Sequence, residues 1–154
     1  MRRLGKSLTI SIVVLAAVVF LVQWLWLRPY VRIDSFGENM RLATIAANRF
    51  HAQFNADQFQ AIYDEATPAF QNGGGRTLLL SAMKQSKERF GNVLHAEKVA
   101  ANAFPGGEVR FVYNTRCEKG DTTEFFVWRA NGKTATLVHY QISPGTKKPK
   151  SHRV

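Results

Sequence analysis

Residues 51–71 hold the densest group of side chains that could take part in proton transfer. Asp64 and Glu65 are adjacent, and neighbouring helical residues point about 100° apart, so the two carboxylates cannot share a proton on one face. His51 follows Phe50, a member of an apolar stripe, and we expect its side chain to flank the packed face. This stretch therefore predicts a packing corner rather than an active site.

Glu124 and His139 form a second candidate group. A two-residue hairpin turn at Asn131-Gly132 sets a strand register in which Glu124 faces His139, with Thr115 alongside. A carboxylate bonded to an imidazole can act as a general acid–base couple. The same residues also fit a cross-strand ion pair, worth about 0.2–1 kcal/mol. No third polar anchor is evident, so we assign no catalytic residue and keep Glu124 and His139 as weak candidates.

The sequence predicts no metal site and no cofactor. The histidines and Cys117 lack the spacing of metal ligands. Asn72–Gly75 is rich in glycine, but Arg76-Thr77 follows where a phosphate-binding loop has lysine and serine or threonine. Cys117 is the single cysteine, so it is either a buried free thiol or a link between chains.

The first half of the domain shows the period of helices. Ser35 and Glu38 fit a capping box, and the helix that they open carries one apolar stripe, formed by Phe36, Met40, Ala43, Ala47, Phe50 and Phe54. Asn55 is placed to cap a second helix, and Pro68 starts a further turn. A third helix is expected over residues 77–90, closed by Gly91.

From residue 92 onward the period becomes two. Four strands are expected, at residues 92–103, 108–117, 122–129 and 133–143, joined by short loops rich in glycine. Three helices followed by an antiparallel meander predict an α+β domain with the helices on one sheet face.

The two faces of this sheet differ in composition. The face toward the helices is predicted to hold Val109, Phe111, Tyr113, Phe126, Trp128 and Leu137. The opposite face is too apolar for a simple wetted surface, and contiguous apolar patches usually mark a partner interface. We predict that this interface uses Val112, Phe125, Val127, Val138 and Tyr140.

The N-terminal region predicts an uncleaved membrane anchor. Residues 8–27 carry no charge, and a helix of about 20 residues spans a bilayer core. Trp24, Trp26 and Tyr30 mark its interfacial end, and more positive charge precedes the span than follows it. The expected organisation is a cytoplasmic basic N-terminus (1–7), a transmembrane helix (8–28), a linker (29–35), the α+β domain (36–143) and a disordered basic tail (144–154).

The distribution of charge argues against nucleic-acid binding. The formal net charge is +10, but the excess lies in the two ends of the chain. Residues 33–146 contain twelve basic and eleven acidic side chains. A phosphate-binding surface clusters basic residues on the folded domain, so no nucleic-acid partner is expected.

Several segments resemble the nuclear transport factor 2-like (cystatin-like) superfamily. The resemblance rests on the helix-turn FNADQFQAIYDEATPAF, on RFGNV closing a helix, and on EFFVWRANGK and LVHYQI in the last strands. It covers residues 36–143 and looks most like small membrane-anchored or secreted bacterial proteins. One departure is Thr134-Ala135-Thr136, where such relatives often have a tryptophan. The resemblance implies a cone-shaped domain, and enzymes of this fold place Asp, His or Tyr inside the cone.

These features lead to one expected function and one alternative. The expected function is a non-enzymatic interaction or assembly module, anchored in the bacterial inner membrane with its domain on the periplasmic side. It would be a small accessory subunit of an envelope complex, contacting a protein partner or a second copy through the outer sheet face. The alternative is a small-molecule-binding or isomerase-like enzyme that uses the cone interior.

Overall fold

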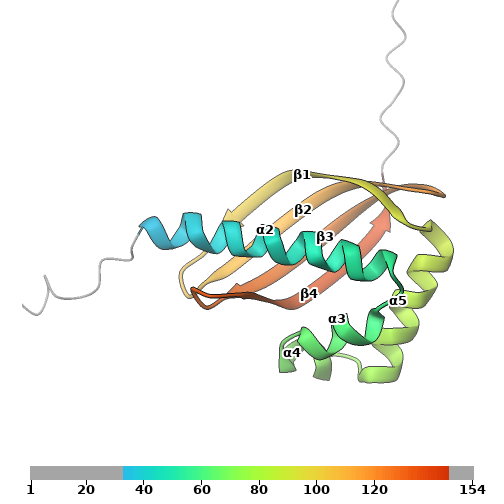
Figure 1. Cartoon of the computed structure of the whole chain (residues 1–154), viewed down its shortest axis with the longest axis horizontal. Helices are drawn as coiled ribbons and strands as arrows, with labels where there is room; N and C mark the ends of the chain where they lie inside the picture. The colour runs from blue at the N-terminus through green and yellow to red at the C-terminus, as the bar shows by residue number, and fades with distance from the viewer. Residues whose placement is uncertain (1–32, 146–154) are drawn as a thin grey trace, which may run out of the picture. The chain divides into compact units, whose positions relative to one another are not determined.

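The computed structural model describes residues 33–145 (Figure 1). Its helices are α2 (Ile33–Asn55), α3 (Phe59–Glu65), α4 (Pro68–Asn72) and α5 (Arg76–Phe90). Its strands are β1 (Val93–Ala103), β2 (Glu108–Cys117), β3 (Gly120–Ala130) and β4 (Ala135–Pro144). The α+β architecture with a four-stranded antiparallel sheet is therefore confirmed.

The expected membrane span lies outside the described residues, as do Trp24, Trp26, Tyr30 and most of the basic tail. None of the helices within residues 33–145 is long and apolar enough to cross a membrane. The described part of the chain differs from the expected boundaries at both ends. Pro144, expected in the disordered tail, belongs to β4. Ile33–Ser35, expected in the linker, already belongs to α2, so Ser35 is not the residue that begins the helix.

The long helix α2 packs by the expected stripe. Ala43, Ala47, Phe50 and Phe54 are all buried. Figure 1 shows α2 lying across one face of the sheet. Apolar residues at intervals of three and four stand on one side of a helix, which explains why this side meets the sheet.

The shorter helices begin and end largely as their sequence indicates. The Thr67 hydroxyl accepts a hydrogen bond from the backbone N–H of Phe70, and Pro68 follows in the first turn of α4. Gly91 ends α5 with a positive φ of 78°, a conformation that favours glycine.

Asn55 has a different role from the one expected. It does not cap α3, whose N-cap is Gln58 without a side-chain bond. Instead its amide donates to the backbone carbonyl of Val93 and accepts from the backbone N–H of Val93, both at 2.8 Å. The side chain therefore joins the end of α2 to the start of β1.

We expect Asn55→Ala to lower the free energy of unfolding by about 1–3 kcal/mol, because both backbone groups of Val93 lose their side-chain partner. Gln58→Ala is the matched control, since Gln58 makes no capping bond, and it should change stability by less than about 0.5 kcal/mol. Urea unfolding followed by circular dichroism measures both variants. Equal losses would contradict the assigned role of Asn55.

The strands follow one another in space in the order β1-β2-β3-β4. Their registers differ from those expected. Counting back from the hairpin turn predicts Tyr113 beside Phe126 and Phe111 beside Trp128. In the structure Tyr113 lies opposite Glu124 and Phe111 opposite Phe126, a shift of two residues that leaves each side chain on its expected face. Residues 131–134 form a longer loop than the expected two-residue turn, and Ala130 pairs with Ala135.

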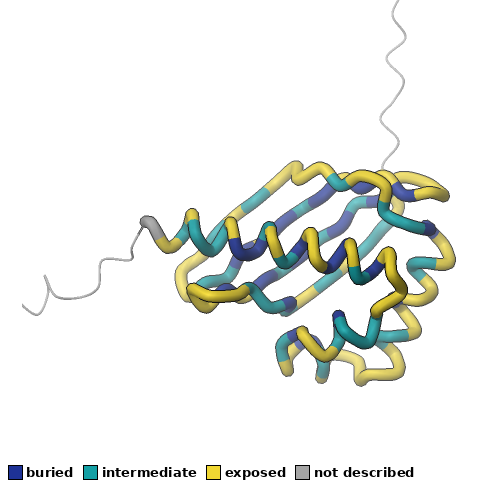
Figure 2. The backbone as a smooth tube through the Cα atoms, viewed as in Figure 1, coloured by how far each residue is buried: buried dark blue, intermediate teal, exposed yellow. Residues whose placement is uncertain are grey.

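The core lies between α2 and the inner face of the sheet. All six residues predicted for this face are buried, and Figure 2 shows buried positions alternating with more exposed ones along β2 and β3. Aromatic rings fill much of the space: Phe126 contacts Phe50 edge to face at 5.1 Å and stacks on Trp128 at 5.6 Å between ring centroids. Such pairs add about 0.5–1.5 kcal/mol each to the effect of burial.

Candidate functional site

Glu124 on β3 is the most deeply buried charged side chain of the core, with 1% of its surface exposed. Three side chains from three elements bind its carboxylate. His51 of α2 lies 2.9 Å from Oε2 through Nε2, and the Tyr140 hydroxyl of β4 donates to Oε1 at 2.8 Å. The Thr115 hydroxyl of β2 donates to Oε2. Glu124, His51, Thr115 and Tyr140 are called the Glu124 network below.

The expected pairing of Glu124 with His139 is wrong. An irregularity in the pairing of β3 with β4 falls between Val127 and Trp128. Trp128 pairs with Leu137 and Val127 pairs with His139, which leaves Val138 as the extra residue of a bulge. His139 is therefore exposed on the outer face, and its ring lies beside that of Phe125.

The same bulge moves Tyr140 to the inner face. Tyr140 pairs with Phe126, and its ring contacts those of Phe126 and Phe50 at 4.9 and 4.6 Å. One additional residue in a strand reverses the face of every residue that follows it. Tyr140 consequently does not belong to the outer surface for which the sequence predicted it.

His51 is the member of the Glu124 network whose burial the sequence did not predict. It was expected to flank the packed face, but it is buried and makes edge contacts with the rings of Phe50, Tyr113 and Phe126. A signal for its burial does exist. His51 lies four residues after Ala47 and three before Phe54, positions that widen the apolar stripe rather than leave it.

Burial and hydrogen bonding shift the pKa of Glu124 in opposite directions. Desolvation alone would raise the pKa of this carboxyl. The hydrogen bond and charge of His51, with the hydroxyls of Thr115 and Tyr140, outweigh it and hold the pKa below its ordinary value. Burial beside this carboxylate raises the pKa of Tyr140 well above its ordinary value and that of Tyr113 to about 12. The surroundings thus favour an ionised Glu124 and neutral phenols at Tyr140 and Tyr113.

Enclosure limits the chemistry that this network can perform. A general acid or base must come within hydrogen-bond reach of the substrate proton. The Glu124 carboxylate already has three partners, and aromatic rings surround His51. The arrangement fits a satisfied polar network that joins α2, β2, β3 and β4 across the core.

Cys117 is a buried free thiol. Its pKa is raised, chiefly by burial, so the thiolate form is disfavoured.

No group of three histidine, cysteine, aspartate or glutamate side chains within residues 33–145 converges as a metal site.

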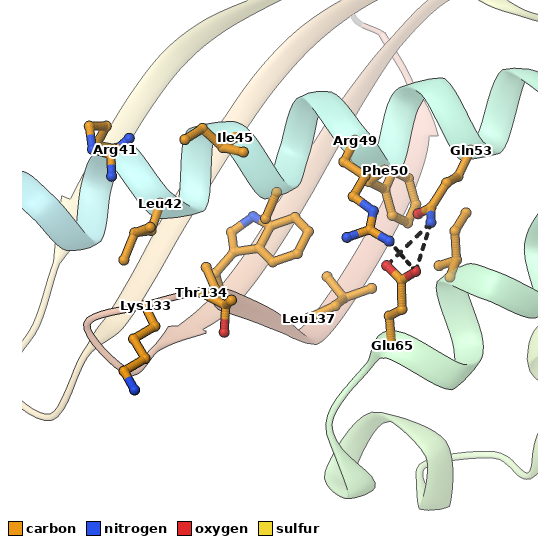
Figure 3. A pocket seen from close by; sticks show the side chains of 14 residues that line it. Arg41, Leu42, Ile45, Arg49, Phe50, Gln53, Glu65, Lys133, Thr134 and Leu137 are labelled. Carbon is orange, nitrogen blue, oxygen red and sulfur yellow. Dashed lines mark hydrogen bonds and ion pairs between the residues drawn. The ribbon is translucent and has the colours of Figure 1, made fainter.

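A groove of about 310 Å³ lies between α2, α3 and the start of β4 (Figure 3). Leu42, Ile45, Trp128 and Leu137 are among the residues that line it. Figure 3 shows Arg49 and Gln53 of α2 bonded to Glu65 of α3 at one end. The groove has the volume of a small ligand site, so it offers a ligand more room than the enclosed Glu124 network does.

The outer face of the sheet carries the other predicted surface. Val112 lies opposite Phe125, and Val127 is the next outward-facing residue of β3. These three and Val138 are half-buried, while polar and charged side chains surround them on the same face. The apolar area is smaller than expected, because Tyr140 points inward. We call Val112, Phe125 and Val127 the apolar centre of the outer face.

Comparisons of this chain with protein-family models, with curated proteins and with solved structures found no match. The resemblance to the nuclear transport factor 2-like superfamily therefore stays a prediction.

Proposed function

We propose that this protein is a non-enzymatic interaction module, anchored in the bacterial inner membrane, that contacts a protein partner through its outer sheet face. The cone-shaped domain would stand on the periplasmic side as a small subunit of an envelope complex. The anchor rests on residues 8–28 of the sequence, and the interface rests on the described domain.

The observation that carries the proposal is the unequal covering of the sheet. The helix α2 packs on the inner face, whereas no helix within residues 33–145 lies over the apolar centre of the outer face. An apolar centre within a polar surround is the usual organisation of a protein–protein interface. The Glu124 network supports the same proposal, because its enclosure suits a structural role better than catalysis.

Site-specific photocrosslinking in native membranes tests this function. A photoreactive phenylalanine at Phe125 in the full chain should give a protein adduct, and Val127→Lys should abolish it by placing a charge in the apolar centre. Leu78 on α5 provides the matched control, since it is 64% exposed and apolar but lies on the helical side. The same label at Leu78 should give no such adduct.

One further measurement separates loss of the interface from loss of the fold. Thermal unfolding of Val127→Lys should match that of the parent chain, since Val127 is only half-buried. No adduct at Phe125, or an adduct that persists with Val127→Lys, would overturn the proposed interface.

A further inference from the structure

Two rows of charged side chains frame the apolar centre of the outer face. In one row Glu108 of β2 lies opposite Arg129 of β3. In the other row Arg116 of β2 lies opposite Asp121 of β3. Along each strand these residues are four positions from the Val112–Phe125 pair, so the two rows lie at equal distances on either side of it.

The signs of the charges alternate around the centre. On β2 the order is acidic then basic, from Glu108 to Arg116, and on β3 it is acidic then basic, from Asp121 to Arg129. Because the two strands are antiparallel, each row contains one charge of each sign. A surface with this pattern is complementary to itself after a half-turn, which is the requirement for an isologous dimer.

We propose that a second copy of this chain occupies the outer face, related to the first by a twofold axis that runs across the strands at Val112 and Phe125. This inference rests on the proposed function and specifies its partner. The axis places Arg129 of one copy over Asp121 of the other, and Glu108 over Arg116. Val112 and Phe125 of one copy then lie over the same residues of the other, and Val127 lies over Thr123. The four charges of each copy lie over four opposite charges. Glu108 shares its carboxylate between Arg116 of the other copy and Arg110 of its own strand, which it already binds at 2.8 Å.

The shape of the face agrees with this pairing. A hollow of about 290 Å³ lies at the Asp121 end, and its lining includes Glu97, Arg116 and Asp121. The side chains of Glu97 and Asp121 form no ion pair within residues 33–145, and neither does Arg129. Packed sheets cross at about 30°, and a long arginine side chain can span the resulting offset. Arg129 of the second copy thus reaches a hollow that presents two carboxylates.

An axis along the strands would also bring opposite charges together, but it fits the face less well. It would place Arg110 of one copy against Val127 of the other, whereas the axis across the strands places Arg110 against Asn114. Arg110 already binds Glu108 of its own strand, so it keeps an ionic partner under either axis. The axis across the strands gives its guanidinium a further polar neighbour, whereas the axis along the strands covers it with an apolar side chain, so the axis across the strands is favoured. The apolar centre is small, and we expect association in the micromolar range or weaker.

Charge exchange between two variants of the full chain tests the proposal. Arg129→Asp and Asp121→Arg should each weaken self-association about tenfold, because every replacement changes two symmetric contacts. Mixing the two variants should restore association, since Asp at 129 then meets Arg at 121. Lys84→Asp on α5 makes the same change of charge on the helical side and should have no effect. Sedimentation velocity in detergent measures the parent chain, the three variants and the mixture.

The results of this experiment distinguish the proposed dimer from a different dimer axis and from a different protein partner. Restoration by mixing supports the axis across the strands. A monomeric parent chain, single variants that associate normally, or a mixture that stays dissociated would each overturn it. An adduct at Phe125 with a mass other than that of two chains, alongside a monomeric parent chain, would overturn the dimer while leaving the proposed function intact.

Discussion

Glu124→Ala is expected to lower the free energy of unfolding by about 3–5 kcal/mol, the usual cost of removing one partner from a buried charged pair. The variant leaves His51, Thr115 and Tyr140 without their shared acceptor. It also leaves a cavity beside His51 and Tyr140, whose rings both contact that of Phe126. Equilibrium unfolding in urea, followed by near-ultraviolet circular dichroism, measures the loss.

Glu38→Gln is the control for this prediction. Glu38 and Arg41 lie about one turn apart on α2 and form an ion pair. Both side chains are more than two-fifths exposed. Water and salt screen such an exposed pair, so Glu38→Gln should change stability little. If Glu124→Ala cost no more than Glu38→Gln, the Glu124 network would not join the core elements as described.

The same network predicts an acid-sensitive component of stability. The folded-state pKa of Glu124 is lowered, so its contribution is fully present above the ordinary pKa and is lost as the pH falls through the folded-state value. The stability difference between the parent chain and Glu124→Gln should therefore shrink as the pH is lowered from 7 toward 3. A difference that grows over this range would contradict the ionised state of Glu124.

Gly107→Ala is expected to destabilise the fold by about 2–5 kcal/mol, the combined cost of a positive φ and of steric overlap. Gly107 has a φ of 80°, and a Cβ there would lie 2.2 Å from the carbonyl oxygen of Ala130. The two backbones are held together by a hydrogen bond from the N–H of Ala130 to the carbonyl of Gly107 at 2.8 Å. Neither segment can therefore move away easily.

Gly106→Ala isolates the steric part of this effect. Gly106 has nearly the same φ, 83°, but a Cβ there meets nothing within 4 Å. Gly106→Ala should lower the free energy of unfolding by only about 1–2 kcal/mol, which is the contribution of the unfavourable backbone conformation. Thermal unfolding of the two variants side by side measures the difference, and equal losses would show that the contact with Ala130 is unimportant.

Local patterns in the sequence predicted the elements and the inner face of the sheet. The stripe of α2, the turn that starts at Pro68 and the six inner residues of β2, β3 and β4 were all confirmed. These features depend on periods of 3.6 and 2, which the chain carries without reference to distant residues. A register shifted by two residues keeps the same faces, which is why the inner face was right although the register was wrong.

The partners of Glu124 could not be predicted in the same way. The bulge at Val138 changes the face of Tyr140 and removes His139 from the core, and it leaves no mark in the period of β4. His51 reaches Glu124 only because α2 crosses the sheet at that point, 73 residues away in the chain. The sequence by itself determined which residues are apolar, where the helices and strands lie and which way most side chains face. The tertiary structure alone decided which side chains meet at Glu124, because strand register and helix placement depend on packing across the whole domain.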